Sequence, residues 1–284
     1  MSTTVLDPID GAVFREAFNR RPFVITHRLA DHALFTLPRL VELARSLPED
    51  RVEYNSGKLP VSVDRGMTPR NGLSVEETIR RIEHCDSWMA LKNVEQDAEY
   101  GALLAKALAQ VAEHSEPICP GMCHAEAFIF VSSPGSITPY HIDPEYNFLL
   151  QIRGTKFVHM LDGSSPDVLS EEELEEFYVA GATRNLTYRE ELRQKEWVTT
   201  LHPGQALHFP LTFPHWVENG PEVSISFSIT FRADASNRRE VLYRINHRLR
   251  RLGLNPRPVG DAWTDTIKYG VFDVARRAKK RVVG

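Results

Sequence analysis

The stretch TPYHID, residues 138–143, carries two metal-ligating residue types, His141 and Asp143, two positions apart in a predicted β-strand. Side chains at positions i and i+2 of a strand point to one face, so these two can bind one metal ion while Ile142 points away. A second histidine, His215, follows Pro214 downstream. Two histidines and a carboxylate on one side of a metal form the facial set of non-haem Fe(II) oxygenases, which leaves coordination positions open. An oxygenase is therefore the first hypothesis.

The composition is that of an ordinary globular protein. The chain has 284 residues, of which 42% are hydrophobic and 25% charged, enough for one large domain or two small ones. Its three cysteines are too few for a disulfide framework, and its polar start lacks the pattern of a signal peptide. No apolar run approaches the roughly 20 residues that span a bilayer. We therefore expect a cytoplasmic protein with no membrane partner.

Short strands dominate the chain from Glu126 onward. They are predicted at residues 127–132, 140–152, 156–161, 197–201, 206–209 and 223–232, with glycine and proline turns between them. Successive strands of this kind indicate an antiparallel barrel or sandwich and not a βαβ sheet. The expected fold class is mainly β with flanking α-helices.

Helices are predicted on both sides of these strands. Helix-start signals and apolar stripes mark residues 36–47, 74–82 and 103–111, and an acidic helix from Ser170 lies in an insert at 164–195. We interpret that helix as a solvated structural element without a catalytic role. No repeat or linker is evident, so we expect a single domain. It would comprise N-terminal helices and strands (1–120), a core (121–235) and basic C-terminal helices (236–284).

The charge is unevenly distributed along the chain. The net charge is −4, yet residues 237–284 carry thirteen Lys and Arg against four Asp and Glu, a local +9. Val241, Ile245 and Leu249 recur there at helical spacing, as in an amphipathic helix with a solvated basic face. No nucleic-acid motif accompanies the charge, so nucleic acid is not an expected partner. Alternatively, this apolar stripe, which Leu252 extends, could form the interface of a homodimer.

Three segments together are similar to one enzyme family. They are the T-P-x-H-x-D spacing at 138–143, the run QIRGTK at 151–156, and the glycine-to-histidine segment at 204–215. Over about residues 128–232 the chain resembles JmjC-type, cupin-like 2-oxoglutarate oxygenases, in particular their asparaginyl hydroxylase branch. The resemblance implies a double-stranded β-helix (jelly-roll) core. It also implies Fe(II) bound by His141, Asp143 and His215, with 2-oxoglutarate and dioxygen as cosubstrates.

The same resemblance implies residues that bind 2-oxoglutarate. Lys156 stands fifteen residues after His141 and would pair with the distal carboxylate of the cosubstrate, assisted by the hydroxyl of Thr138. A buried carboxylate requires such a cation and such hydrogen bonds. Asn147, six residues after His141, would place its amide near the metal-proximal carboxylate or another ligand.

The substrate is left open by these residues. Gln205 stands where the family usually has an acidic residue, and Phe213-Pro214 replaces an aromatic pair, so substrate contacts are not carried over. The expected reaction is hydroxylation of a C–H bond in a peptide, a protein side chain or a small metabolite, with demethylation as the other outcome. One alternative is a metal-dependent cupin enzyme that does not use 2-oxoglutarate and would not need Thr138 and Lys156. Another alternative is a non-catalytic cupin-like binding or regulatory protein.

Other metal-ligating residue types lie near the predicted site. Three ligands already complete the facial set, so we expect structural or rim roles for His159, His202 and His208. A second group suits zinc by residue type but shows no fourth ligand, and we interpret it as core or loop residues: Cys119, Cys123 and His124.

Overall fold

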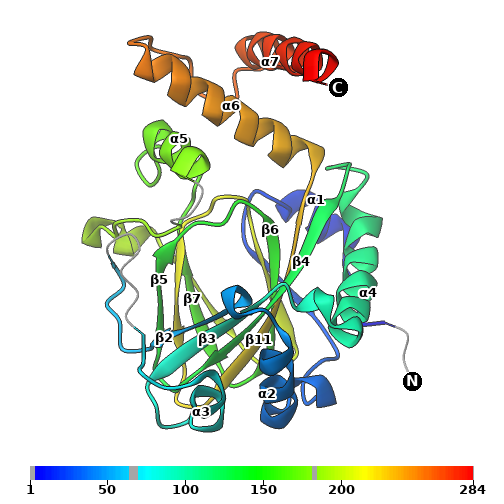
Figure 1. Ribbon diagram of the computed structural model, residues 1–284, viewed down its shortest axis with the longest axis vertical. Helices are drawn as coiled ribbons and strands as arrows, with labels where there is room; N and C mark the ends of the chain where they lie inside the picture. The colour runs from blue at the N-terminus through cyan, green and yellow to red at the C-terminus, as the bar shows by residue number, and fades with distance from the viewer. Residues whose placement is uncertain (1–3, 64–69, 181–183, 284) are drawn as a thin grey trace.

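Two antiparallel sheets face each other in the computed structural model, which describes residues 4–63, 70–180 and 184–283 (Figure 1). The seven-stranded sheet contains, in spatial order, β1 (Phe23–Thr26), β9 (Gln205–Phe209), β6 (Tyr146–Arg153), β11 (Ser224–Arg232), β4 (Cys123–Ser132), β3 (Ser87–Lys92) and β2 (Val52–Ser56). The four-stranded sheet contains β5 (Ile137–His141), β10 (His215–Asn219), β7 (Lys156–Met160) and β8 (Trp197–Leu201). The mainly β, jelly-roll prediction is confirmed.

The strand predicted at 140–152 is two strands in two different sheets. The chain leaves β5 after His141 and enters β6 at Tyr146, so the turn between them crosses from the small sheet to the large one. Pro144 lies in this turn, and a proline inside a strand pattern is the signal that the prediction missed. Two further strands, β2 and β10, were not predicted.

Helices cover the outer face of the seven-stranded sheet. They are α1 (Gly11–Ala17), α2 (Leu37–Ser46), α3 (Val75–Arg80) and α4 (Ala98–Ser115), with one of the strands β1, β2 and β3 between each consecutive pair. The apolar residues of β11 alternate with polar ones and pack in one buried cluster with Phe14, Leu40 and Leu104 of these helices. The alternate residues of β11 face the space between the sheets: Ser224, Ser226, Ser228 and Thr230. The inside of the sandwich is therefore partly polar.

The predicted insert packs against the strand that carries His141. Its helix α5 (Glu171–Ala180) buries Leu174 and Phe177 in a cluster with Tyr140 and Ile142. The helix predicted as a solvated structural element thus also has an apolar face, which packs in this cluster. Ile142 points to this cluster and away from the candidate ligands, as predicted.

Two C-terminal helices complete the described structure, α6 (Asp234–Arg251) and α7 (Ala262–Val283). Helix α6 lies across one end of the sandwich beside α5, and α7 packs on α6 at the outside of the molecule (Figure 1). An ion pair joins Arg250 of α6 to Glu175 of α5, with Nε and Oε2 3.0 Å apart and Glu175 only 1% exposed.

The N-terminal part of the chain contributes strands to the sandwich itself. β1 lies at one edge of the large sheet, and β2 and β3 lie at the other. That residues 1–284 form a single domain stays a prediction. Within the described ranges, no helix combines the length and the apolar character needed to cross a bilayer.

Candidate metal centre

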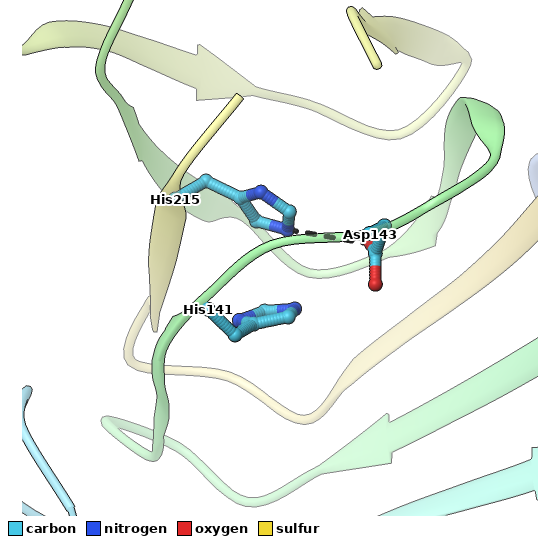
Figure 2. A group of neighbouring side chains, drawn as sticks. All are labelled: His141, Asp143 and His215. Carbon is cyan, nitrogen blue, oxygen red and sulfur yellow. Dashed lines mark ion pairs between the residues drawn. The ribbon is translucent and has the colours of Figure 1, made fainter. Parts of the chain in front are cut away.

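Three ligand-type side chains converge at one end of the four-stranded sheet (Figure 2). His141 is the last residue of β5, Asp143 follows it in the turn, and His215 is the first residue of β10. The antiparallel register of the two strands sets His215 directly opposite His141. One ligand atom of each residue lies within 4.8 Å of the others. The structure therefore brings together all three predicted ligands.

Both imidazoles present a free Nε2 atom to the centre. Nδ1 of His141 lies 2.7 Å from the carbonyl oxygen of Pro139, and Nδ1 of His215 lies 2.9 Å from that of Phe213. A carbonyl only accepts hydrogen bonds, so each Nδ1 carries the proton and each Nε2 keeps its lone pair. Burial lowers the pKa of His215 to about 3, so this imidazole is neutral at neutral pH. Neutral imidazoles are the form that binds metal.

Asp143 is ionised beside these imidazoles. Its burial is the largest effect and acts to raise the pKa, but the charge and hydrogen bond of Arg184 and the two nearby histidines together outweigh burial, and the pKa falls to about 2. Arg184 Nη1 lies 2.6 Å from Oδ1 of Asp143, and the other oxygen, Oδ2, lies 3.7 Å from Nε2 of His215. Two imidazoles and one carboxylate are a donor set that fits Fe(II).

Two charged residues of the centre were not predicted from the sequence. Arg184 belongs to the insert, 41 residues after Asp143, and no local pattern marks that contact. Glu145 follows Asp143 in the turn, with Oε1 3.6 Å from Nη2 of Arg184. Burial raises the pKa of Glu145 to about 7. A carboxylate two residues after the H-x-D spacing was the one signal available for Glu145.

A cavity of about 500 Å³ opens beside the three candidate ligands. Its walls include Thr138 and Asn147, both predicted from the resemblance to contact the cosubstrate. Asn147 accepts a hydrogen bond from Ser228 at 2.7 Å, which fixes its amide on the inner face of the large sheet. The far wall comes from strands β2, β3 and β4 and mixes aromatic with charged side chains: Glu53, Trp88, Lys92 and Phe128. A cavity of this size and mixed polarity suits a small ligand.

Lys156 lies deeper between the two sheets and outside the described lining of the cavity. It is 3% exposed, and its ammonium donates a hydrogen bond to Oδ1 of Asn219 at 2.6 Å. Within the described part of the chain no carboxylate pairs with it, and burial lowers its pKa to about 7. A buried amine without an anion is costly, so the site favours an anionic ligand. The predicted role of Lys156 gains support from this burial but stays a prediction.

The spacing along β7 sets the depth of this lysine. Met160 pairs with His215, and Lys156 lies four residues further along the strand, roughly 13 Å away at the usual rise per residue. Gly154 allows the preceding turn, because φ is +70° there and a Cβ would lie 2.6 Å from the carbonyl oxygen of Val223. A separation of this size between the backbone positions leaves room for a short dicarboxylate between the lysine and the candidate ligands.

The other histidines have structural contacts. Asn19 N–H donates to Nε2 of His208 at 3.1 Å, so Nδ1 of His208 carries the proton and donates to the carbonyl oxygen of Asn147 at 3.1 Å. His159 stacks on Trp216 with ring centroids 3.7 Å apart, and His202 is exposed. These contacts agree with the structural or rim roles expected of His159, His202 and His208, which stay a prediction.

The cysteines contact other kinds of side chain. Cys119 Sγ lies 3.4 Å from the hydroxyl of Tyr146, and Cys123 Sγ accepts a hydrogen bond from Asn237 at 3.4 Å. Among the residues with described positions, the group that could hold a metal ion is His141, Asp143 and His215.

A family model for a cupin-like domain matches residues 17–237, more than three quarters of the chain. The chain belongs to the cupin-like domain family. The family-level prediction is therefore confirmed, while the asparaginyl hydroxylase branch stays a prediction. Among curated proteins, no sequence matches this cupin-like protein.

Solved structures of YcfD from Escherichia coli resemble this cupin-like protein in fold. One has 17% sequence identity and a TM-score of 0.52 over 90% of this chain and 62% of that chain. A second, described as a ribosomal oxygenase, has 16% identity and a TM-score of 0.54 over 96% and 68%. A third, in complex with cobalt and 2-oxoglutarate, has 18% identity and a TM-score of 0.51 over 91% and 61%. This chain therefore spans about three fifths to two thirds of the length of YcfD.

We expect the purified protein to bind one Co(II) ion per chain and His215→Ala to lose this binding, because two ligands remain where three are needed. The measurement is a Co(II) titration followed by visible absorption. His202→Ala removes an exposed histidine and is the matched control. Equal Co(II) binding by His215→Ala and the wild type would contradict the ligand assignment.

Proposed function

We propose that this cupin-like protein is an Fe(II)- and 2-oxoglutarate-dependent dioxygenase that hydroxylates a C–H bond of its substrate. The observation that carries the proposal is the convergence of two free Nε2 atoms and one ionised carboxylate at the end of the sandwich. This donor set is facial, so it leaves positions for a cosubstrate and dioxygen. YcfD, which shares the fold, is described as a ribosomal oxygenase and was solved with cobalt and 2-oxoglutarate.

Each residue of the site has a defined task in this proposal. His141, Asp143 and His215 would hold Fe(II), which when bound supplies the oxidative chemistry with dioxygen. Lys156 would hold the distal carboxylate of 2-oxoglutarate, with Asn219 fixing the ammonium at 2.6 Å. Thr138 and Asn147 would orient the cosubstrate from the wall of the cavity. In this proposal the protein positions the reactants.

The buried lysine favours this proposal over a cupin enzyme that does not use 2-oxoglutarate. Such an enzyme needs the three ligands but has no use for a buried amine between the two sheets. A purely binding or regulatory protein would not need to keep an intact set of three ligands. A peptide or protein is the substrate class that we propose first, because the similar YcfD is a ribosomal oxygenase.

We expect Fe(II) and 2-oxoglutarate together to produce succinate at a slow rate even without the substrate. Asp143→Ala should abolish this turnover because it removes a ligand, and His202→Ala should retain it. The measurement is succinate by mass spectrometry, together with the visible absorption band of the anaerobic mixture. Succinate production by Asp143→Ala at the wild-type rate, or none by the wild type, would overturn the proposed function.

Binding of 2-oxoglutarate should take up a proton on Lys156. The amine has a pKa of about 7 in the free protein, and only its charged form pairs with a carboxylate. Above pH 7 the free amine is mostly neutral and must be protonated on binding, so Kd should rise by up to about tenfold per pH unit. Below pH 7 the amine is already charged and Kd should be nearly constant.

Calorimetry of the Mn(II)-loaded protein in buffers of different ionisation enthalpy measures this uptake. We expect close to one proton per site well above pH 7 for the wild type. Lys156→Met should bind 2-oxoglutarate more than tenfold more weakly and take up no proton. The control is Lys58→Met, which removes an exposed lysine paired with Asp86. A Kd for the wild type that does not change with pH would rule out this role of Lys156.

Self-association is proposed through a different apolar stripe from the one predicted. Val241, Ile245 and Leu249 of α6 are half-buried, and Leu252, which extends this stripe, is 77% exposed. A longer exposed apolar stripe lies on α7 at helical spacing, with exposures of 74%, 48%, 68% and 69% for Trp263, Ile267, Val271 and Val274. Four such residues on one helix face are typical of an interaction site.

We expect the wild type to be a dimer and Trp263→Ser combined with Val271→Ser to be a monomer, because the double variant interrupts the apolar stripe. Analytical ultracentrifugation at micromolar concentration distinguishes the two states. Val198→Ser changes a residue of β8 that is 56% exposed and should leave the dimer intact. A monomeric wild type would end the dimer proposal.

A further inference from the structure

Arg184 reaches the metal centre from the insert and not from the sandwich. Its Nη1 atom lies 2.6 Å from Oδ1 of Asp143, and its Nη2 atom lies 3.6 Å from Oε1 of Glu145. The side chain keeps 45% of its surface accessible because it lines the cavity. One guanidinium therefore contacts both carboxylates of the turn that follows β5.

The backbone around Arg184 is fixed to the strand that carries His141. Ile142 N–H donates to the carbonyl oxygen of Arg184 at 3.1 Å, and Leu186 N–H donates to that of Tyr140 at 3.0 Å. Asn185 lies opposite His141 in an antiparallel bridge. The arginine thus starts from a backbone position that two hydrogen bonds define, directly beside two of the candidate ligands.

The insert that carries Arg184 is itself held in place. Leu186 is buried with Tyr140 and Ile142, which anchors the segment on the outer face of β5. Helix α5, earlier in the insert, is tied to α6 by the ion pair between Glu175 and Arg250. A charged pair with one member 1% exposed is not a loose surface contact.

The two oxygens of Asp143 have different environments because of this contact. Oδ1 is bound by Arg184, whereas Oδ2 faces Nε2 of His215 at 3.7 Å. A carboxylate without such a partner can rotate, or can bind a metal with both oxygens. Hydrogen bonds from outer residues to metal ligands typically change metal affinity by 10- to 100-fold.

We infer that Arg184 is a positioning residue of the metal centre. It holds one oxygen of Asp143 and leaves the other as the single oxygen directed at the metal. The inference rests on the proposed function, since it concerns the metal site on which that function depends. It gives the insert a role beyond packing: the insert supplies the group that orients a ligand.

The test compares Arg184→Met, Arg184→Lys and the wild type by Co(II) titration of the full chain. Arg184→Met keeps the length of the side chain but removes the charge and its hydrogen bonds, so Co(II) should bind roughly 10- to 100-fold more weakly. Arg184→Lys keeps a donor and a charge, and it should restore part of the affinity. Arg193→Met removes an exposed arginine of the same insert that pairs with Glu190, and it should match the wild type.

A second measurement separates positioning from a general loss of structure. The visible spectrum of bound Co(II) depends on its coordination number, and we expect it to change in Arg184→Met and not in Arg193→Met. The thermal unfolding of the metal-free variants should be cooperative in both. An effect on stability alone would leave the Co(II) spectrum unchanged and would count against the inference.

The possible outcomes distinguish a failure of the inference from a failure of the proposed function. If the wild type binds Co(II) and Arg184→Met binds it equally well with the same spectrum, Arg184 has no positioning role, and the proposed function stands. If Arg184→Met binds Co(II) more tightly, the repulsion between guanidinium and metal dominates and the inference is wrong. If the wild type binds no Co(II), both the inference and the proposed function fail.

Discussion

The pairing of β10 with β5 is the constraint on which the rest of the site depends. Because His215 lies directly opposite His141, two ligands far apart in the sequence become neighbours through backbone hydrogen bonds alone. Asp143 then needs only the turn after β5 to join them. A shift of one residue in this register would turn His215 to the outer face of the sheet, where Trp216 now packs.

The polar interior is the second feature that distinguishes this sandwich from a structural one. The inner face of β11 carries hydroxyl side chains, and these bond to the amides of neighbouring β6: Ser226 to Gln151 and Ser228 to Asn147. A core built only for stability would fill this space with apolar side chains. The strand instead divides its faces, with aromatic and aliphatic residues toward the helices and polar residues toward the ligand space.

Local patterns in the sequence were enough to predict the two ligands on one segment and the antiparallel strands. His141 and Asp143 follow from strand geometry, whereas His215 was proposed only because a third ligand was needed, and no local pattern joins it to a segment about seventy residues away. β10 directly follows Pro214, which is typical of a turn, and the strand was not predicted. Arg184 could not have been found, because its contact with Asp143 arises only when the insert folds back onto β5.

The order of the ligands along the chain has a consequence for folding. His141 and Asp143 precede the insert and His215 follows it, so a metal ion that joins them would close a loop of about seventy residues. A metal ion that binds the folded chain and not the unfolded one stabilises the fold by its free energy of binding. The supply of metal would then affect the stability of the folded protein as well as its catalytic activity. The metal-free protein would unfold more readily than the protein with its metal ion bound.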